Sequence, residues 1–359
     1  MDALNGMKQK TIRVGKFTIG EGNPVFIIAE AGVNHNGSVA LAKRLVDAAK
    51  AAGADAVKFQ NFEAQEVTTA DAGMAEYQKR NTGKKESQID MIRKFELSAK
   101  NFAGIAAHAK RRGILFFSTP HGGFRSVADM ERLGVPLYKF GSGDLNNLPV
   151  LRYAARLRKP MILGTGMADL KDIREPVETI RKAGNDKIIV LQTTTDYPAH
   201  LADANIRAMQ TIARTYNVIP GYSDHTTGAT AAIAAVALGA RVLEKHITLD
   251  NDMRGPDHKA SASPVDFKAY VKAVRDAEVA LGSAEKRVAK RSKQYISLVM
   301  KSVVARNAIR KGDKLTERNL AIKRPAQGLP PKFYFDMLGK RAKRDLKPDE
   351  FIRRKDYGR

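Results

Sequence analysis

The sequence of 359 residues has no cysteine. A chain without cysteine forms no disulfide bond, offers no thiolate to a metal and has no cysteine nucleophile, so any metal must be bound by histidine and oxygen ligands. Long hydrophobic runs are also missing: the most apolar helical stretch, residues 230–243, is too short to cross a bilayer and carries Arg241. Residues 1–16 are polar and lack the apolar core of a secretion signal. We therefore expect a cytoplasmic protein without a membrane partner.

Acidic residues are few, with 38 Asp and Glu against 62 Lys and Arg, which gives a net charge of +24. The excess is uneven, since residues 284–359 hold 23 Lys and Arg against 8 Asp and Glu. A basic surface attracts nucleic acid as well as small anions. The basic residues are scattered, however, and no nucleic-acid-binding motif is recognisable. We interpret the charge as a solvated surface that helps to attract an acidic substrate, and we expect no nucleic-acid partner.

Short apolar runs alternate with amphipathic segments from residue 24 to about residue 282, a pattern typical of βα units with a parallel sheet. Small and apolar residues recur at helical spacing between the runs, for example in residues 39–52, 172–183 and 229–238. Eight strands in about 260 residues predict an α/β fold, a (β/α)8 TIM barrel. The expected strands are residues 25–31, 54–59, 114–118, 137–140, 161–163, 187–192, 218–221 and 242–246.

A doubly wound open sheet would alternate in the same way. No Gly-x-Gly-x-x-Gly turn follows the first strand, which disfavours a dinucleotide-binding fold. One connection is unusually long: about forty residues separate Phe59 from the helix near Phe102, and residues 86–97 among them have a helical pattern. We expect this insertion on the catalytic face of the barrel, where the βα loops vary most.

The character of the sequence changes after Gly282. Residues 284–297 are basic and polar, as in a linker. Residues 301–310 and 321–325 then resemble short strands on either side of a turn that contains Gly312. We predict a barrel domain over residues 1–283, a linker over residues 284–297 and a small domain over residues 298–359.

Polar side chains follow most of the predicted strands, at the end where a barrel places its functional groups. Taken singly, each would more often be a solvated strand end or a hydrogen-bonded core residue. Their occurrence after so many separate strands is hard to explain by packing. The residues are Glu30, Asn34 and His35 at the first strand, Lys58 and Gln60 at the second, Lys139, Ser142 and Asp144 at the fourth, Thr195 and Tyr197 at the sixth, Ser223 and His225 at the seventh, and Glu244 and His246 at the eighth.

Two histidines form a candidate metal site. His225 and His246 are 21 residues apart, about one βα unit, so both imidazoles should project from neighbouring strands. Two imidazoles with carboxylates nearby suit Mn²⁺ or a similar divalent ion with open water positions. A zinc site normally has three protein ligands, and no third is evident.

Two lysines indicate an anion. A phosphate or carboxylate would offset the repulsion between the buried ammonium groups of Lys58 and Lys139. Ser142 and Ser223 add hydroxyl donors for its oxygens. The residues alone therefore predict a barrel that binds a phosphorylated or carboxylated small molecule beside a metal.

These motifs closely resemble the sialic acid synthase family, which includes N-acetylneuraminate and legionaminic acid synthases. The similarity runs from F-I-I-A-E-A-G-V-N-H-N-G (residues 26–37) through V-K-F-Q, Y-K-F-G-S-G-D, Y-S-D-H-T and E-K-H-I-T-L-D to G-P-D-H-K-A-S (residues 255–261). The segments S-V-V-A, A-I-R-K-G-D, I-K-R-P and L-G-K-R-A-K-R-D resemble the family's C-terminal antifreeze-like (SAF) domain, a β-clip fold. The resemblance implies a TIM barrel followed by this small domain.

The resemblance also implies an enzyme that condenses phosphoenolpyruvate with N-acetylmannosamine or a related N-acylated aminosugar. His225 and His246 would hold a divalent metal, with Mn²⁺ ahead of Mg²⁺ and Co²⁺, which polarises the sugar aldehyde. C3 of phosphoenolpyruvate would attack that aldehyde, water would add at C2, and phosphate would leave by C–O cleavage. Glu30 would move protons.

Further roles follow from the same resemblance. Lys58, Lys139, Ser142 and Ser223 would hold phosphoenolpyruvate, and the two lysines with Glu30 form the implied catalytic set. The remaining candidates for substrate binding are Gln60, Asp144, Thr195, Tyr197, Asp257 and Arg324.

Arg324, in I-K-R-P, carries a prediction about assembly. In the family, the small domain reaches the partner's barrel, and this arginine contacts the N-acyl group of the substrate. The resemblance therefore implies a domain-swapped homodimer with composite active sites. Without the family context, Arg324 would be a surface arginine in a basic domain.

Three positions depart from the family pattern. Gly164 stands in L-G-T-G-M where serine is common, so one contact to phosphoenolpyruvate is lost or replaced by backbone. Thr195 stands where some members have asparagine, and Met300 where some have an aromatic residue. These changes bear on the sugar that is accepted.

Three alternatives remain open. The nearest is an N,N'-diacetyllegionaminic acid synthase that uses 2,4-diacetamido-2,4,6-trideoxymannose. Another phosphoenolpyruvate-condensing barrel acting on a phosphorylated sugar would not explain the appended domain. Ice binding by the antifreeze-like domain is disfavoured, because its high charge does not suit a flat, weakly charged face.

Overall fold

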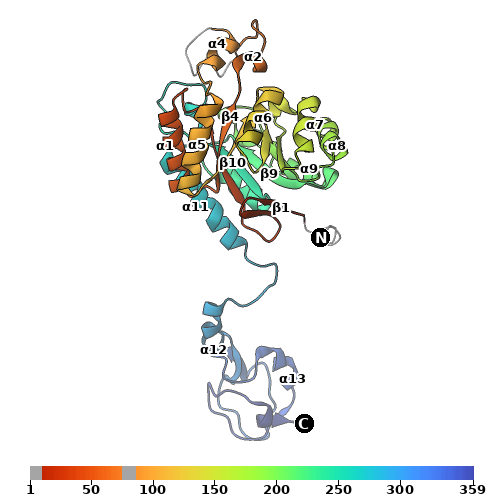
Figure 1. Cartoon of the computed structure of the whole chain (residues 1–359). Helices are drawn as coiled ribbons and strands as arrows, with labels where there is room; N and C mark the ends of the chain where they lie inside the picture. The colour runs from red at the N-terminus through yellow and green to blue at the C-terminus, as the bar shows by residue number, and fades with distance from the viewer. Residues whose placement is uncertain (1–9, 75–85) are drawn as a thin grey trace. The chain divides into compact units, whose positions relative to one another are not determined.

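The computed structural model describes residues 10–74 and 86–359. It divides into two compact units, Met1–Gly282 and Ser283–Arg359. Figure 1 shows the first unit from red to cyan and the second in blue. The division falls within a residue of the predicted end of the barrel.

The first unit is built on one parallel sheet of eight strands in the order β5-β4-β3-β10-β9-β8-β7-β6. The two strands at the ends of this order, β5 and β6, contact each other, so the sheet curves into a nearly closed barrel. This confirms the predicted barrel, and each predicted strand overlaps an observed one. The strands are β3 (Phe26–Gly32), β4 (Ala56–Asn61), β5 (Leu115–Pro120), β6 (Tyr138–Phe140), β7 (Met161–Gly164), β8 (Ile188–Thr193), β9 (Ile219–Asp224) and β10 (Val242–His246).

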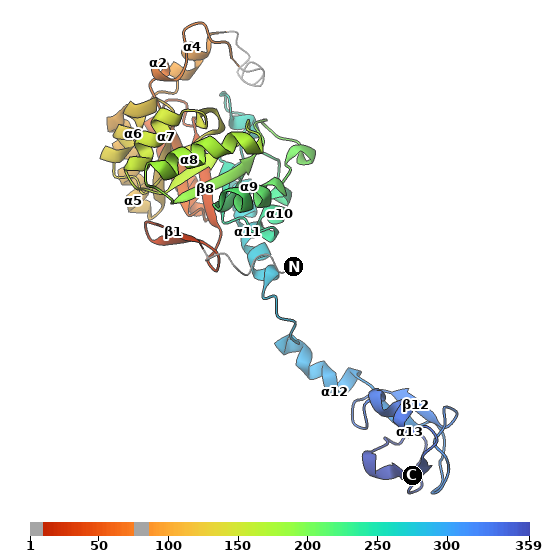
Figure 2. The same ribbon diagram turned by 90° about the vertical axis from the view of Figure 1, so that its right-hand side faces the viewer.

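The barrel strands are buried on both faces, which explains why their sequences read as continuous apolar runs without alternation. One face packs inside the barrel and the other against the helices. The outer helices are α1 (Val39–Ala51), α5 (Ala99–Arg112), α6 (Gly123–Arg132), α7 (Leu148–Arg156), α8 (Arg174–Lys182), α9 (Ala208–Tyr216), α10 (Thr230–Ala237) and α11 (Pro264–Leu281). Figure 2 shows α8, α9 and α10 along one side of the sheet.

Local sequence signals mark several helix ends. The hydroxyls of Ser38 and Ser98 accept a backbone N–H at the start of α1 and α5, and Ser263 does the same for α11. Gly113 ends α5 in the left-handed conformation, which glycine adopts without steric cost. Among the helices of the described residues, none has the length and apolar character needed to span a membrane.

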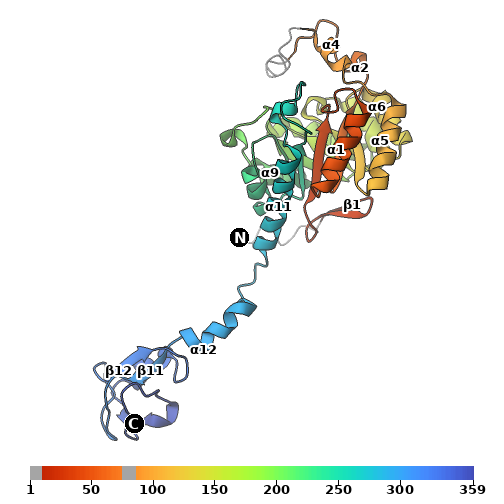
Figure 3. The same cartoon turned by 90° about the vertical axis from the view of Figure 1, so that its left-hand side faces the viewer.

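An antiparallel hairpin of β1 (Thr11–Val14) and β2 (Phe17–Gly20) precedes the barrel, although the sequence analysis treated residues 1–16 only as a polar segment. Its apolar residues alternate with polar ones, and Ile12, Val14 and Ile19 are buried in the barrel's core cluster. Figures 1 to 3 place β1 at the opposite end of the barrel from α2 and α4. The hairpin therefore covers the end of the barrel away from the long insertion.

In the described residues, the predicted insertion after β4 includes the short helices α2 (Ala64–Val67) and α4 (Gln88–Arg93). The helical pattern of residues 86–97 is therefore realised as a six-residue helix. Figure 3 shows both helices beyond the ends of the barrel strands, as expected for a loop on the catalytic face. Short 3-10 turns also occur in the first unit: Ser142–Asp144, Leu170–Ile173, Leu201–Asp203 and His258–Ala260.

The second unit has its own small core, formed by ten buried residues that include Val303, Leu315 and Ile352. The predicted linker contains a 3-10 turn, Lys290–Tyr295, and the exposed helix α12 (Ile296–Val299) begins within it. The two predicted strands are present but shorter. The elements of this unit are β11 (Ser302–Ala305), β12 (Leu320–Lys323), α13 (Tyr334–Met337), β13 (Arg341–Ala342), β14 (Tyr357–Gly358) and 3-10 turns at Pro331–Phe333 and Arg354–Asp356.

Candidate active site

A cavity of about 350 Å³ opens at the carboxyl ends of the barrel strands. This volume lies within the range of small-molecule sites. Every strand of the barrel contributes to its wall, and the insertion adds an apolar side with Met91, Ile92 and Phe95. The polar and charged residues of the wall are Glu30, Lys58, Gln60, Gln88, Thr119, His121, Lys139, Ser142, Thr193, Thr195, Tyr197, Ser223, His225, Glu244, His246 and Asp257.

Most of the residues that the sequence analysis singled out lie in this wall, and four do not. Asp144 does not line the cavity, but its Oδ2 lies 2.7 Å from Nδ1 of His121, which does. Arg324 is exposed in the second unit, directly after β12. Asn34 and His35 are fully buried and also lie outside the wall.

Four charged side chains form a network on the floor of the cavity. Nζ of Lys58 lies 2.6 Å from Oε2 of Glu30 and 3.7 Å from Oε2 of Glu244. Lys139 donates a hydrogen bond of 2.9 Å to Oε1 of Glu244. All four are buried, and two cations face two anions. An unpaired buried charge costs several kcal/mol, so each member stabilises the charge of its neighbours.

The network separates the pKa values of its members. Burial raises the pKa of Glu30, although Lys58 opposes the shift, and burial lowers the pKa of Lys58. For Glu244, burial acts to raise the pKa, but Lys139 and Lys58 outweigh it and hold the pKa far below its usual range. For Lys139, burial acts to lower the pKa, but the charges of Glu244 and Glu30 outweigh burial, so the pKa is raised. The shifts bring the pKa values of Glu30 and Lys58 towards each other, which makes this pair a candidate for acid–base chemistry.

Hydrogen bonds hold the network in place. Lys58 donates to Oγ1 of Thr119 at 2.9 Å, and Gln60 donates to Oε1 of Glu30 at 3.1 Å. Ser223 donates to Oε1 of Glu244 at 3.0 Å. The strands are in parallel register here, with Glu30 opposite Lys58 and Glu244 opposite Ser223, so the barrel itself brings these groups together.

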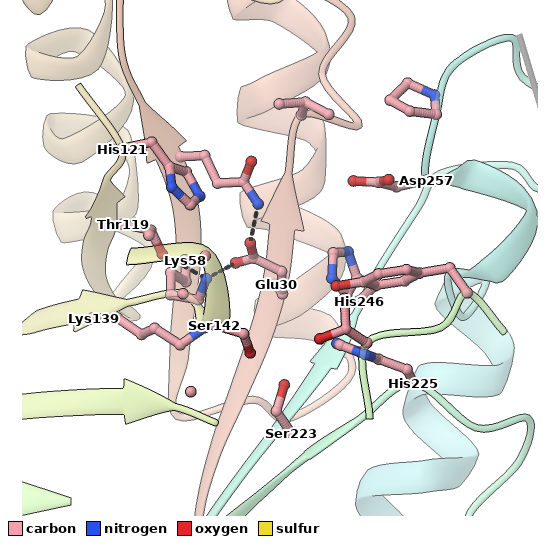
Figure 4. A pocket seen from close by; sticks show the side chains of 18 of the residues that line it. Glu30, Lys58, Thr119, His121, Lys139, Ser142, Ser223, His225, His246 and Asp257 are labelled. Carbon is pink, nitrogen blue, oxygen red and sulfur yellow. Dashed lines mark hydrogen bonds and ion pairs between the residues drawn. The ribbon is translucent and has the colours of Figure 1, made fainter. Parts of the chain in front are cut away.

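The two predicted metal-binding histidines lie together on another side of the cavity, as Figure 4 shows. Their ring centroids are 5.5 Å apart. The ring of Tyr197 lies 4.2 Å from that of His225. Nδ1 of His225 lies 2.7 Å from the carbonyl oxygen of Thr194, to which it must donate, so the lone pair of this imidazole is on Nε2.

Both rings suit a cation. Burial lowers the pKa of His225 to about 4 and that of His246 well below its usual value, so both imidazoles are neutral at pH 7. The buried Nδ1 of His246 has no hydrogen-bond partner among the described residues. No group of three or more His, Cys, Asp or Glu side chains in that part of the chain is placed to hold a metal. The donors therefore fit a divalent ion that keeps water or substrate ligands better than a closed zinc site.

Asp257 is a second titratable carboxyl in the cavity. Burial, with a smaller contribution from Glu30, raises its pKa to about 7. The side chain follows β10 and is buried. At neutral pH it can therefore donate or accept a hydrogen bond, which suits contact with sugar hydroxyls.

Glycines shape the wall next to Ser142. A Cβ on Gly164 would lie 3.3 Å from both N and Oγ of Ser142, and one on Gly166 would lie 2.2 Å from Oγ1 of Thr195. Ser142 Oγ accepts a hydrogen bond of 2.8 Å from the Gly166 N–H, which leaves its own hydrogen to donate. Gly164, the departure noted in the sequence, thus lets the Ser142 backbone approach β7 closely.

Sequence reasoning gave no role to five polar residues of the cavity wall: Gln88, Thr119, His121, Thr193 and Glu244. Glu244 was noticed but not assigned a role, although it pairs with both lysines. Thr119 and His121 were not considered, and both stand in the S-T-P-H segment at the end of β5. Their position at the end of the third strand was the available signal.

Comparisons with known proteins agree with this architecture. The profile of the NeuB family matches residues 45–286, and the profile of the SAF domain matches residues 301–357. The chain is 44% identical over 329 residues to N,N'-diacetyllegionaminic acid synthase of Campylobacter jejuni, covering 91% of this chain and 98% of that protein. It is 39% identical to the protein of the same name from Legionella pneumophila over 349 residues, covering 96% and 95%.

A solved structure is similar as well. N-acetylneuraminic acid synthetase of Leptospira borgpetersenii, in complex with citrate, superimposes with a TM-score of 0.70 at 31% identity, covering 80% of this chain and 95% of that one. The fold is a TIM barrel followed in the chain by an SAF domain. The chain belongs to the NeuB family, whose named relatives are synthases of sialic-acid-type sugars.

Proposed function

We propose that the protein condenses phosphoenolpyruvate with an N-acylated aminosugar to form a nine-carbon 2-keto acid, with release of phosphate. The observation that carries the proposal is the pairing of two buried lysines with two carboxylates, across the cavity from two neutral imidazoles (Figure 4). Such a cavity offers one side to a doubly anionic substrate and another to a divalent cation.

Phosphoenolpyruvate is expected against Lys58 and Lys139. Its negative charges replace part of the contact that Glu30 and Glu244 now supply to the two ammonium groups. Ser142 and Ser223 add hydroxyl donors for its oxygens. The supporting observation is that both hydroxyls line the same cavity as both lysines.

The chemistry can be written with the side chains present. C3 of phosphoenolpyruvate forms a bond to the aldehyde carbon of the open-chain sugar, whose oxygen takes up a proton and becomes a hydroxyl. Water adds at C2, the C2–O bond to phosphate breaks, and the C2 hydroxyl loses its proton to give the 2-keto group. Glu30 takes a proton from that water, and its raised pKa suits this exchange. A divalent ion held by His225 and His246, Mn²⁺ in this proposal, would supply Lewis-acid polarisation of the aldehyde.

The sugar in this proposal is 2,4-diacetamido-2,4,6-trideoxymannose ahead of N-acetylmannosamine. Both relatives named above as N,N'-diacetyllegionaminic acid synthases align over nearly the whole chain. The apolar side formed by Met91, Ile92 and Phe95 also suits a sugar that carries a methyl group in place of a hydroxymethyl group.

The proposal includes a homodimer in which Arg324 reaches the N-acyl group bound by the partner. Arg324 is exposed and lies in a separate compact unit, as such a role requires. The cytoplasm, where phosphoenolpyruvate is produced, is the compartment that fits the reaction.

Phosphate release tests the proposal. The purified chain, with Mn²⁺ and phosphoenolpyruvate, is given each sugar in separate reactions, with EDTA and sugar-free reactions as controls. We expect EDTA-sensitive release that is faster with the diacetamido sugar. Preference for N-acetylmannosamine would make the protein a sialic acid synthase instead, and no release with either sugar would contradict the proposed condensation.

A further inference from the structure

His121 faces the cavity but has no part in the proposed reaction. It directly follows β5, and its backbone N–H donates to the carbonyl oxygens of Asn61 and Thr119, each at 3.1 Å. Its Nδ1 lies 2.7 Å from Oδ2 of Asp144, in the 3-10 turn after β6. Two strands therefore set the position of this histidine–carboxylate pair, and only the histidine lines the cavity.

The backbone beside the ring is shaped to admit it. A Cβ on Gly141 would lie 3.2 Å from Cε1 of His121, closer than an ordinary contact. Because residue 141 is glycine, the imidazole can lie against the start of the turn that carries Asp144. The ring is thereby confined between the turn and β5.

One nitrogen of the ring is left for a ligand. Nδ1 lies 2.7 Å from the carboxylate, and Nε2 has no partner in residues 10–74 and 86–359. A quarter of the side chain is exposed, since its relative accessibility is 25%. Nε2 accepts a hydrogen bond from a hydroxyl when the ring is neutral and donates one to a carbonyl when the ring is protonated.

Strand register places the backbone of His121 beyond that of Lys58. In the pairing of β4 with β5, Lys58 is opposite Phe117 and Gln60 is opposite Thr119. His121 is four residues beyond Phe117, roughly 13 Å further along the strand direction at 3.3 Å per residue. The Lys58 ammonium extends the same way and donates to Oγ1 of Thr119 at 2.9 Å, so His121 follows two residues after the hydroxyl that holds this ammonium.

The residues around His121 in the cavity suit contact with the sugar. Figure 4 shows His121 and Asp257 on opposite sides of the cavity, with Glu30 between them. The helix α4 of the insertion lines the same cavity with Met91 and Ile92. A polyhydroxylated ligand lying between the two walls would meet a titratable group on each side.

We propose that His121 contacts the aminosugar through Nε2 and that Asp144 is a positioning residue that orients the imidazole. This inference rests on the proposed function, because it deepens the account of the sugar site. It also reassigns Asp144, which the sequence analysis expected to bind substrate directly.

The test compares three variants of the full chain with a matched control. His121→Leu removes both ring nitrogens, His121→Gln keeps a polar group, and Asp144→Asn removes the charge behind the ring. The control is His108→Gln, because His108 forms a similar pair with Asp47, 2.8 Å away, on the outer helices α5 and α1. KM and kcat are measured for each substrate, and sugar binding without phosphoenolpyruvate is measured by calorimetry with both candidate sugars.

We expect His121→Leu to raise the KM and Kd for the sugar about tenfold, as expected for a lost hydrogen bond to a ligand, and to leave the KM for phosphoenolpyruvate within about twofold. His121→Gln should restore much of the affinity, Asp144→Asn should raise the sugar KM with little change in kcat, and His108→Gln should behave as wild type.

Two results would overturn the inference alone: an unchanged sugar KM in His121→Leu, or an equal rise in the KM for phosphoenolpyruvate. A wild-type protein that binds a sugar but releases no phosphate would contradict the proposed condensation and leave the binding comparison decisive. A wild-type protein that binds neither sugar would overturn both.

Discussion

The lysines of the barrel cavity and those of the C-terminal unit have opposite surroundings. Lys58 and Lys139 are buried and pair with two buried carboxylates. In the second unit, Lys323 contacts Asp349 with both side chains about half exposed or more, at 48% and 66%. Water screens exposed pairs, whereas buried pairs depend on each other.

The difference shows that net charge alone says little about function. The C-terminal unit carries most of the basic excess, yet the cations that can do chemistry are the few in the barrel whose pKa values burial has shifted. Removing a buried lysine of the barrel should therefore destabilise the protein much more than removing an exposed lysine of the second unit.

The sharpest test of the cavity is His246→Ala. We expect turnover to fall about a thousandfold or more if the imidazole holds a Lewis-acidic ion worth several kcal/mol, with loss of Mn²⁺ binding by calorimetry and an unchanged melting temperature. His108→Ala, which removes a histidine that pairs with Asp47 on the outer helices, serves as the control. Full activity of His246→Ala at saturating Mn²⁺ would contradict its assignment as a ligand.

The comparison of buried and exposed lysines is tested directly by Lys139→Met and Lys323→Met. We expect Lys139→Met to lower the free energy of unfolding by about 3 kcal/mol, because Glu244 keeps only its more distant partner Lys58. Lys323→Met should cost at most about 0.5 kcal/mol. Urea unfolding measures both changes in the free energy of unfolding. Equal changes in the two variants would show that the buried and the exposed lysine do not differ in this respect.

The pH dependence of stability should reveal Asp257. Its folded pKa of about 7 lies above the ordinary aspartate value of 3.8, so the stability linked to its protonated form is complete below pH 3.8 and is lost as pH rises through 7. Asp257→Asn should therefore raise the melting temperature by several degrees at pH 8 relative to wild type and leave it nearly unchanged at pH 4.

The buried carboxyl of Asp257 accounts for the direction of this effect, because the wild-type charge must form in the cavity. Thermal unfolding at both pH values measures it, with Asp266→Asn at the exposed start of α11 as a control. A variant that is less stable than wild type at pH 8 would show that the ionised carboxylate is favourably bound.

The smallest effect concerns the second unit. Arg324→Ala should raise the KM for the sugar about tenfold, the effect of losing one charge-assisted hydrogen bond, and change that for phosphoenolpyruvate little. Arg318→Ala, an exposed arginine of the same unit, is the matched control. Equal rises for both substrates, or a monomeric enzyme with full activity, would count against a composite site.

Much of the barrel could be predicted because its strands are buried on both faces. Continuous apolar runs such as residues 187–192 are visible without knowledge of their neighbours, and each overlaps an observed strand. The hairpin of β1 and β2 was missed, because the alternation of apolar and polar residues spans only four residues per strand. Its apolar side chains are buried only by packing against the barrel, which the sequence does not show.

In the candidate site, too, some features could be predicted from the sequence and others could not. A barrel exposes its functional groups at the carboxyl ends of strands, so a list of polar residues at predicted strand ends already contained Glu30, Lys58, His225 and His246. The partnership of Glu244 with both lysines could not be predicted, because it joins β10 to β4 and β6 across the interior.

The eight strands and the residue types at the strand ends could be predicted from the sequence, since burial and strand pattern are local properties of the chain. Which of those residues face each other, and how burial shifts their pKa values, depends on the folded barrel. The folded barrel also brings Asp144 Oδ2 to 2.7 Å from Nδ1 of His121. Distances between side chains on different strands depend on how the barrel closes, and desolvation depends on which atoms cover a group. Neither can therefore be predicted from the order of the residues.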